Sequence, residues 1–440
     1  MRVRALLLPL LLFPLQALAQ EWCGSPICAR FEGTDLIRMR APGRFEVTFS
    51  KREGFGDQVY DLQADPGKLR DLGAGFVENG ILWTKVEEVG NSVTYFANNA
   101  TSLELLEANG VRVRARDAGQ HQQYGLPGMP WDALGYTQTF TVYATGEVYV
   151  EYDLIASRDI QINTFDMIVK STGNWGSNGT PGDGQNEAHC VGQYGLNQPY
   201  APQDSSFAMI SSNGSHYFAD ILMAFYKNTY NGSYWNEGFS NGDYRCGLYL
   251  GDFNPTLHTG TSHLRLMMRI AEDMNDPTSA SKYADAYRLP DTGFSVTQGT
   301  KVLNSPGDRD CDGFDETQGD YVLRRQAGQG VAFELHANRP RMNPAFAILD
   351  WNDAVPIGVY VDSVLQLANG DRVRSSKAGS TLIVQLLGEF PDDVSVMLAA
   401  PAVQVPALPW SSGAALAAAL GASGARRIAK KSRASSSARS

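Results

Sequence analysis

Hydrophobic and polar residues alternate along much of this chain. The pattern is clear in residues 44–50 (RFEVTFS), 110–117 (GVRVRARD) and 331–337 (VAFELHA). Alternation with a period of two is typical of strands that bury one face. Helical periodicity is scarce, so a doubly wound parallel sheet is not expected. Many short strands separated by turn residues predict an all-β protein built from antiparallel β-sandwiches.

The strongest hairpin signal lies in residues 137–155 (TQTFTVYATGEVYVEYDLI), where two runs rich in Thr, Val and Tyr flank an Ala-Thr-Gly-Glu turn. Residues 206–226 show a second hairpin signal around Asn213-Gly214, a pair that favours a type I′ turn. We therefore expect a large, supersandwich-like antiparallel domain over residues 20–300. A smaller β-sandwich domain is expected over residues 305–398.

Both ends of the chain differ from this body. Residues 1–19 carry two arginines, an apolar run and then Ala17-Leu18-Ala19, which is the pattern of a secretory signal peptide cleaved before Gln20. Residues 401–440 place VPALP before an Ala-rich run and a basic cluster, and the apolar run is too short to span a bilayer. The alternatives are a buried N-terminal helix or membrane anchor and a solvated basic tail.

The tail resembles the bacterial C-terminal sorting segments of the IPTL/VPxxP-CTERM type. This resemblance implies a Gram-negative protein that is exported to the cell surface, the outer membrane or the extracellular space. It also implies the export and C-terminal sorting machinery as partners. The resemblance covers the tail only and says nothing about the body.

The charge of the body narrows the choice of partners. The chain has 37 basic and 47 acidic residues. Two basic residues lie in the signal segment and six lie from Ala425 onward, and neither segment holds an acid. The remainder therefore has 29 basic residues against 47 acidic ones, a net charge of −18. Phosphate binding needs clustered Lys and Arg, so no nucleic-acid partner is expected.

Five cysteines fit an exported protein, because disulfides persist in oxidising compartments. The WCGSPIC stretch predicts a small Cys23–Cys28 loop. Cys190 and Cys246 are candidates for a second disulfide, and Cys311 is then left over. Spacing alone does not settle this connectivity.

The sharpest motif is GDRDCDGFDETQGD at residues 307–320. Alternating acidic side chains can direct oxygen ligands at one centre, and Gly313 permits a sharp turn, as Ca²⁺ binding requires. The pattern resembles the calcium loops of dockerins and thrombospondin type-3 repeats, which implies a structural Ca²⁺ at the junction of the two sandwiches. The alternative is a solvated acidic turn. The candidate ligands are Asp308, Asp310, Asp312, Asp315 and Glu316.

The best candidate for a catalytic site is the long loop at residues 171–205, because long loops inside compact domains are usually functional. It holds Asn186, His189 and Tyr194, and Arg245 lies on a later turn. In β-elimination at a uronate, His and Tyr suit the proton transfers, and Asn or Arg suits neutralisation of the carboxylate. The set resembles the Asn/His/Tyr/Arg sets of β-sandwich polysaccharide lyases. The alternative is that these are packed loop residues.

Other motifs are missing from the sequence. It has no GxSxG elbow, P-loop or GxGxxG before a helix, and His258 and His263 do not fit HExxH. Four loop aromatics are candidates for stacking on sugars: Tyr124, Trp131, Tyr200 and Trp235.

We therefore expect an exported carbohydrate-active protein, namely a polysaccharide lyase acting on an acidic, uronate-containing polysaccharide. The alternatives are a non-catalytic glycan-binding surface or matrix protein and a glycoside hydrolase. The sequence does not exclude a hydrolase, which needs only two carboxylates across a cleft.

Overall fold

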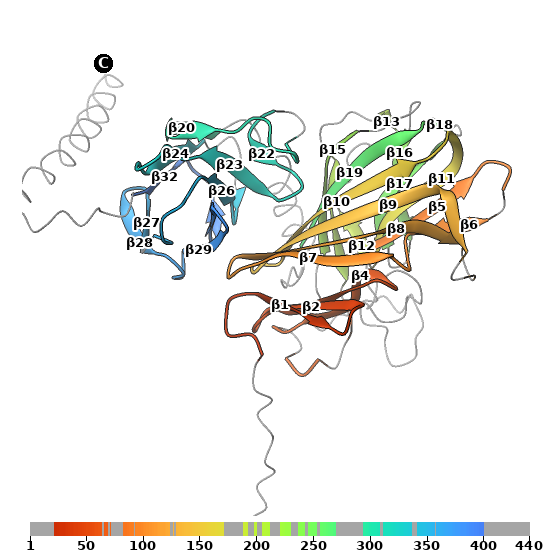
Figure 1. Ribbon diagram of the computed structural model, residues 1–440, viewed down its shortest axis with the longest axis horizontal. Coiled ribbons are helices and arrows are strands. Elements are labelled where there is room, and N and C mark those ends of the chain that lie inside the picture. The colour runs from red at the N-terminus through yellow and green to blue at the C-terminus, as the bar shows by residue number, and fades with distance from the viewer. Residues whose placement is uncertain are drawn as a thin grey trace, which may run out of the picture. The chain divides into compact units, whose positions relative to one another are not determined.

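The computed structural model describes most of the body of the chain. The backbone is described for residues 22–63, 66–68, 71, 82–91, 93–123, 126, 129–170, 188–191, 198–199, 205–211, 221–229, 236–242, 245–252, 256–269, 294–308, 311–336, 341–356 and 358–399. Side chains are described for the same residues except 83, 164, 166–170, 188–252 and 266. All the described strands lie in one compact unit, which ends at Leu398. Every regular element among the described residues is a β-strand, as Figure 1 shows.

The N-terminal part contains two sheets. The first is a four-stranded antiparallel sheet of β1 (Cys28–Glu32), β2 (Leu36–Ala41), β3 (Phe45–Ser50) and β4 (Gly54–Asp61). The second has the order β12-β14-β15-β19-β10-β9-β8-β6-β5-β11-β17-β16-β13, with β7 beside β8 and β18 beside β11. Its strands are β5 (Leu82–Glu88), β6 (Thr94–Phe96), β7 (Ser102–Ala108), β8 (Arg112–Gln123), β9 (Pro130–Tyr143), β10 (Glu147–Ala156), β11 (Ile160–Lys170), β12 (Ala188–Val191), β13 (Gln198–Pro199), β14 (Ser205–Ser211), β15 (Ile221–Thr229), β16 (Asn236–Gly242), β17 (Arg245–Asp252), β18 (Thr256–Leu257) and β19 (Gly260–Arg269).

The C-terminal part contains a five-stranded sheet, a six-stranded sheet and a short pair. The five-stranded sheet comprises β20 (Phe294–Gln298), β24 (Val331–Leu335), β32 (Val394–Leu398), β27 (Gly358–Val361) and β28 (Val364–Leu367). The six-stranded sheet comprises β21 (Thr300–Lys301), β22 (Phe314–Asp315), β23 (Asp320–Arg324), β26 (Ala345–Leu349), β30 (Thr381–Leu386) and β29 (Val373–Ala378), with β23 and β26 parallel. The short pair is β25 (Arg341–Met342) with β31 (Glu389–Phe390).

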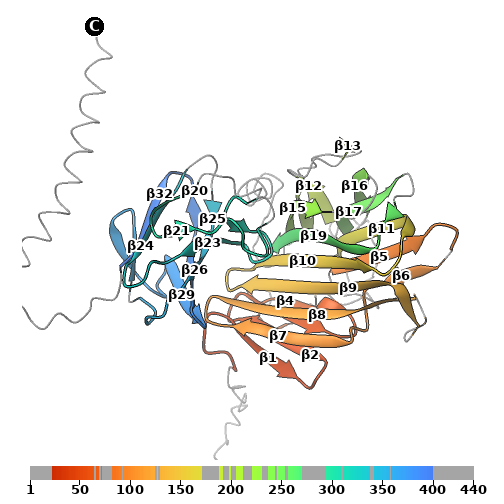
Figure 2. The same cartoon turned by 45° about the horizontal axis from the view of Figure 1, so that its top comes forward.

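The large sheet curls so that distant strands face each other. The rings of Tyr152 on β10 and Phe165 on β11 lie 6.4 Å apart, although four strands separate β10 from β11 in the sheet order. The β1–β4 sheet packs on the same core, where Phe140 of β9 stacks on Phe55 at 4.4 Å and meets Phe49 at 4.8 Å. Figures 1 and 2 show β8, β9 and β10 as long neighbouring strands. The predicted large antiparallel sandwich is confirmed.

The smaller sandwich has its own aromatic centre. Phe333 of β24 and Phe346 of β26 lie 4.4 Å apart, so the five- and six-stranded sheets share a core. Trp351 is fully buried there, with the Arg325 guanidinium 4.3 Å above its ring. The all-β fold with a second, smaller sandwich is therefore confirmed. Tyr143 of the large sheet also belongs to this second core.

The described residues show the pairing of three of the five cysteines. Cys23 and Cys28 form the predicted disulfide, and Cys311 is exposed and unpaired. Strands β12 and β17, which carry Cys190 and Cys246, come within 8 Å of each other between Cα atoms, but those side chains lie outside the described residues.

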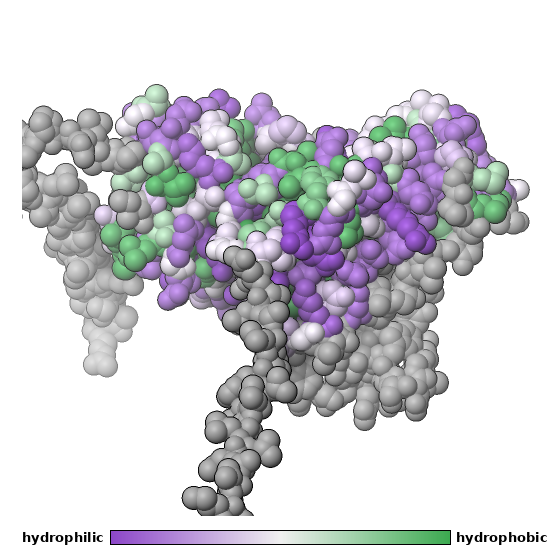
Figure 3. All heavy atoms as spheres, turned by 60° about the horizontal axis from the view of Figure 1, so that its bottom comes forward, coloured by the Kyte–Doolittle hydropathy of each residue, from purple (hydrophilic) through white to green (hydrophobic). Residues whose placement is uncertain are grey.

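On the face shown in Figure 3, hydrophilic residues predominate and hydrophobic residues gather in separate groups. No helix formed by the described residues is long and apolar enough to cross a membrane.

A polar cluster is buried inside the large sandwich. His121 Nδ1 lies 3.1 Å from the Leu134 carbonyl, which can only accept, so Nε2 accepts from the Tyr152 hydroxyl at 2.8 Å. Burial lowers the pKa of His121 to about 4, so the ring is neutral at physiological pH. Asp117 is fully buried, and neither carboxylate oxygen is hydrogen-bonded to a described group. Burial raises the pKa of Asp117 well above its usual value, and nearby backbone N–H groups offset only part of this.

We expect Asp117→Asn to stabilise the fold by about 1–3 kcal/mol at neutral pH, because it removes a carboxyl group that is costly to ionise when buried. The folded pKa lies above the unfolded one, so the folded state holds the proton more tightly. Wild-type stability therefore declines as pH rises above about 4, and the advantage of the variant grows over that range. Denaturant titrations between pH 4 and pH 8 measure this, with the exposed Asp350→Asn as control. A pH-independent difference would contradict the explanation.

Candidate functional site

Strands β10 and β19 bring four charged or titratable side chains together. In their antiparallel register, Asp153 lies opposite His263 and Glu151 lies opposite Arg265. Successive side chains of a strand point to opposite faces, so these four share one face while Tyr152 points into the core. The local sequences EYD and HLR produce this arrangement by alternating charged and apolar residues.

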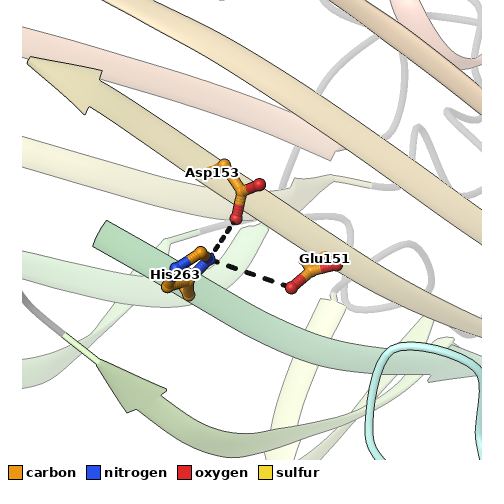
Figure 4. A group of neighbouring side chains, drawn as sticks. All are labelled: Glu151, Asp153 and His263. Carbon is orange, nitrogen blue, oxygen red and sulfur yellow. Dashed lines mark hydrogen bonds and ion pairs between the residues drawn. The ribbon is translucent and has the colours of Figure 1, made fainter. Parts of the chain in front are cut away.

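Three of these side chains, Glu151, Asp153 and His263, lie together in Figure 4, with His263 between the two carboxylates. His263 Nδ1 lies 2.6 Å from Asp153 Oδ1 and 3.9 Å from Glu151 Oε1. Arg265 Nη2 donates to Glu151 Oε1 at 3.3 Å. Among the described residues, Glu151, Asp153 and His263 are the one set of three metal-ligating side chains whose ligand atoms all lie within 4.8 Å of one another.

The four side chains differ in burial. The Arg265 side chain is fully buried, whereas His263, Asp153 and Glu151 remain 25%, 23% and 19% exposed. The buried guanidinium of Arg265 therefore stabilises the negative charge of the Glu151 carboxylate. Because Asp153 accepts from Nδ1–H, Nε2 of His263 carries the lone pair when the ring is neutral. The group can thus accept or donate a proton at Nε2 of a side chain that is partly exposed.

The neighbouring strands extend this polar face. Thr137 and Thr139 of β9 lie beside Asp153 and Glu151 in the strand register. Arg116 of β8 follows in the same row as Thr139 and pairs with a glutamate of β7. The hydroxyl groups of Thr137 and Thr139 therefore lie between the acid–base group and the Arg116–Glu104 ion pair.

One turn of the smaller sandwich covers the adjoining part of this face. Thr141 donates to the Thr317 carbonyl at 3.1 Å, and the Cα of Gly319 lies against the Tyr149 ring. Thr141 and Tyr149 sit one row away from Glu151 on the same sheet face. The 317–319 turn thus ends where the polar group begins.

The first part of the acidic loop is held by its own backbone. Asp308 accepts hydrogen bonds from the N–H groups of Cys311, Asp312 and Gly313 at 2.8, 3.3 and 2.9 Å. Burial raises the pKa of Asp308, and these N–H groups act in the opposite direction. This predicted ligand therefore acts at least as a capping group of the turn.

The second part of the loop is organised by Asp315. Its carboxylate accepts from Ser305, from the N–H and hydroxyl of Thr317, and from the N–H and side chain of Gln318, at 2.7–3.1 Å. Those donors use the oxygen lone pairs that a cation would need. Asp315 therefore fits a calcium shell poorly, whereas Asp308 retains some acceptor capacity. Asp310 lies outside the described residues.

The predicted lyase residues are described only in part. His189 lies on β12 opposite Ile210 of β14, and Arg245 is the first residue of β17. The two strands come within 8 Å of each other between Cα atoms, so the fold brings these backbone segments together. The side chains of His189 and Arg245, and all of Asn186 and Tyr194, lie outside the described residues.

One of the four predicted sugar-stacking aromatics is described. Trp131 is 8% exposed, and its ring stacks on Tyr95 at 4.3 Å within the core. The structure therefore places Trp131 in core packing instead of presenting a free ring face. Tyr124, Tyr200 and Trp235 lie outside the described residues.

Sequence reasoning did not find the group on β10 and β19. In the sequence, His263 stands out only through its spacing from His258, which does not fit the HExxH zinc motif. The available signal was the charged residues at alternate positions of two otherwise apolar strands. Their pairing was hidden because 110 residues separate Asp153 from His263.

Comparison with known proteins gives only distant likenesses. No family model and no curated protein matches the chain. A Klebsiella pneumoniae protein described as a candidate aldose 1-epimerase has a TM-score of 0.36 and 10% identity, covering 57% of this chain and 83% of its own. A polysaccharide lyase has a TM-score of 0.31 and 8% identity, covering 86% of this chain and 46% of its own. An alpha-N-acetylgalactosaminidase from Bifidobacterium bifidum, in complex with GalNAc, has a TM-score of 0.32 and 13% identity, covering 60% of this chain and 38% of its own. The chain thus spans less than half the length of the lyase and of the galactosaminidase, and likenesses this distant say nothing about its activity.

Proposed function

We propose that the chain is a carbohydrate-active enzyme whose acid–base group is the Asp153–His263 pair. The 2.6 Å contact between Asp153 Oδ1 and His263 Nδ1 carries this proposal. A carboxylate behind an imidazole orients the ring and stabilises its protonated form after proton uptake at Nε2. Glu151, held by the buried Arg265, adds a second fixed negative charge beside the ring.

The reaction proposed is β-elimination on an acidic polysaccharide. A base removes the proton beside the uronate carboxylate, the bond to the leaving sugar oxygen breaks, and that oxygen gains a proton. His263 suits the role of base. Arg265 is fully buried against Glu151, so it is poorly placed to neutralise the substrate carboxylate. The predicted Asn186 and Arg245 are the candidates for that role.

Hydrolysis by paired carboxylates is less well supported. Glycosidases place their two carboxyl groups on opposite sides of the bond that breaks. Glu151 and Asp153 instead come from one strand, and their oxygens lie within 4.8 Å of each other on one sheet face. Elimination therefore fits this geometry better than hydrolysis. Non-catalytic glycan binding remains the alternative from another functional class.

We expect His263→Gln and Asp153→Asn each to lower kcat by about 10²–10⁴-fold, because each disables proton transfer at Nε2. The assay is ultraviolet absorbance of the unsaturated product on a panel of uronate polysaccharides. His258→Gln is the matched control, since His258 Nδ1 contacts Asp159 at 3.0 Å in an exposed pair. No product with folded wild-type protein, or equal loss in the control, would count against this function. If the wild-type protein binds a glycan but releases no unsaturated product, the chain is better explained as a glycan-binding protein.

We also propose a structural Ca²⁺ at the acidic loop, with Asp308 as a described ligand that retains acceptor capacity. A cation that binds only the folded state stabilises it by mass action. Excess chelator is therefore expected to lower the thermal midpoint, and added Ca²⁺ is expected to restore it. An unchanged melting curve would mean that the hydrogen bonds to Asp308 and Asp315 suffice to hold the turn.

Export to the cell surface or beyond is part of the same proposal. The predicted signal peptide at residues 1–19 and the sorting segment at residues 401–440 lie outside the described residues. The Cys23–Cys28 disulfide supports an oxidising compartment, because cytosolic thiols are kept reduced.

A further inference from the structure

A row of short side chains leads from the Asp153–His263 pair across three neighbouring strands. Thr137 of β9 lies opposite Asp153, and Ala118 of β8 lies opposite Thr137. Ser102 of β7 lies opposite Ala118 and completes the row. Residues directly opposite each other share one face of a sheet, and three strand spacings of about 4.8 Å make about 14 Å. This short-side-chain row of Thr137, Ala118 and Ser102 is partly exposed and long enough for a short run of linked sugars.

Longer side chains border the short-side-chain row on both sides. On one side, Arg116 of β8 and Glu104 of β7 form an ion pair at 2.7 Å, with side chains 43% and 49% exposed. On the other side, Ile155 follows Asp153 by two residues on the same face of β10 and is 42% exposed. The row is therefore a polar strip between an ion pair and an apolar side chain. This mixture suits the hydroxyl groups and the C–H faces of sugars.

The charged groups along this strip are negative in balance. Three carboxylates, of Glu151, Asp153 and Glu104, face two guanidinium groups, of Arg265 and Arg116, which leaves a formal charge of −1 beside a neutral imidazole. Arg265 is fully buried against Glu151, and Arg116 is paired with Glu104. Each further uronate of a polymer made only of uronates brings another carboxylate to this strip. Like charges at such distances repel, so this surface complements a run of uronates poorly.

We propose that the short-side-chain row binds neutral sugar residues, so that the substrate is a polysaccharide whose uronates are separated by neutral sugars. This inference rests on the proposed function, which places the reacting uronate at the Asp153–His263 pair. The hydroxyl groups of neutral sugars can donate to the Glu104 carboxylate and exchange hydrogen bonds with the hydroxyls of Thr137 and Ser102. Neutral sugars next to the reacting uronate thus find partners where further carboxylates find repulsion.

Isothermal titration calorimetry with the His263→Gln variant, in which cleavage is disabled, compares two acidic polysaccharides. Deacylated gellan carries single glucuronates between neutral sugars, whereas every sugar of polygalacturonate is a uronate. The Kd for gellan is expected to be at least about tenfold lower, because the additional carboxylates of polygalacturonate meet like charges on the strip. The ultraviolet assay with the wild-type protein is run on the same two polymers.

Glu104→Gln, added to the same variant, isolates the charge beside the row. It removes one carboxylate and releases Arg116, so the Kd for polygalacturonate is expected to fall about three- to tenfold, with less than about a twofold change for gellan. Arg116→Gln should instead raise the Kd for polygalacturonate about threefold. Asp350→Asn is the matched control, since Asp350 belongs to an exposed ion pair in the smaller sandwich. It changes the net charge equally and should leave both Kd values unchanged.

The outcomes distinguish this inference from the proposed function. If neither polymer yields unsaturated product but gellan binds more tightly and Glu104→Gln improves polygalacturonate binding, elimination fails and the row is supported as a glycan-binding surface. Binding of polygalacturonate as tight as that of gellan would overturn the inference, whether or not product forms. Binding of neither polymer, or equal effects of Glu104→Gln and Asp350→Asn, would overturn it as well.

Discussion

Replacing Arg112 with methionine is expected to lower the free energy of unfolding by about 3–5 kcal/mol. Arg112 is buried on β8, and each of its guanidinium nitrogens has acceptors. Nε and Nη2 donate to Glu107 at 2.9 and 3.2 Å, and Nη2 also donates to Gln318 at 3.0 Å. Nη1 donates to the Tyr143 hydroxyl at 3.2 Å and to Asp320. Two of these partners belong to the smaller sandwich, so one side chain ties the two β-sandwiches together.

The size of the effect follows from what the substitution leaves behind. Asp320 is fully buried, and burial raises its pKa to about 6 while the charge of Arg112 acts against that rise. Without Arg112, Asp320 must take up a proton or remain as an unpaired buried charge, and Glu107 loses its main partner. Removing one member of a buried ion pair is costly for this reason, even where the intact pair adds little net stability.

Arg116→Met is the matched control for Arg112→Met. Arg116 lies four residues further along β8, but its side chain is 43% exposed and pairs with Glu104 at 2.7 Å. Exposed pairs of this kind contribute about 0–1 kcal/mol. A double-mutant cycle with Asp320→Asn isolates the coupling energy, which should exceed about 1 kcal/mol. Equal losses for Arg112→Met and Arg116→Met in urea titrations would contradict the proposed role.

Alternation was sufficient to predict the strands and the sandwich class. The predicted hairpin at residues 137–155 corresponds to β9 and β10, with Gly146 at a φ of 101° in the turn. Such patterns report which face of a strand is buried, and that is a local property. They do not report which strand lies alongside. The pairing of β10 with β19 therefore could not be predicted, and neither could the site that it forms.

Local composition does not specify what an individual polar or aromatic side chain contacts. Carboxylates in the acidic loop were predicted as metal ligands, yet Asp315 is occupied by hydrogen bonds from its own turn. Short acidic side chains can satisfy backbone N–H groups two or three residues away, and sequence spacing does not distinguish this from metal binding. Trp131, read as a loop aromatic, instead stacks on Tyr95 of β6 in the core.

Replacing Gly319 with alanine is expected to destabilise the fold by about 2–5 kcal/mol, through two separable effects. Gly319 has a φ of +71°, a left-handed conformation that costs an L-residue about 1–2 kcal/mol. An added Cβ would also collide with the Tyr149 ring, in the packed contact between the two sandwiches. Overpacking of this kind adds about 1–3 kcal/mol.

Gly33→Ala separates the two effects, because Gly33 has nearly the same φ of +70° but nothing within 4 Å of its added Cβ. The difference between the two variants in denaturant titrations thus measures the collision with Tyr149. Adding Tyr149→Leu to Gly319→Ala should recover much of that difference, since it removes the ring. Tyr149 precedes Glu151 by two residues on one face of β10, so a displaced turn should also raise KM in the elimination assay proposed above. If Gly319→Ala and Gly33→Ala cost the same, the 317–319 turn does not pack against the sheet as described.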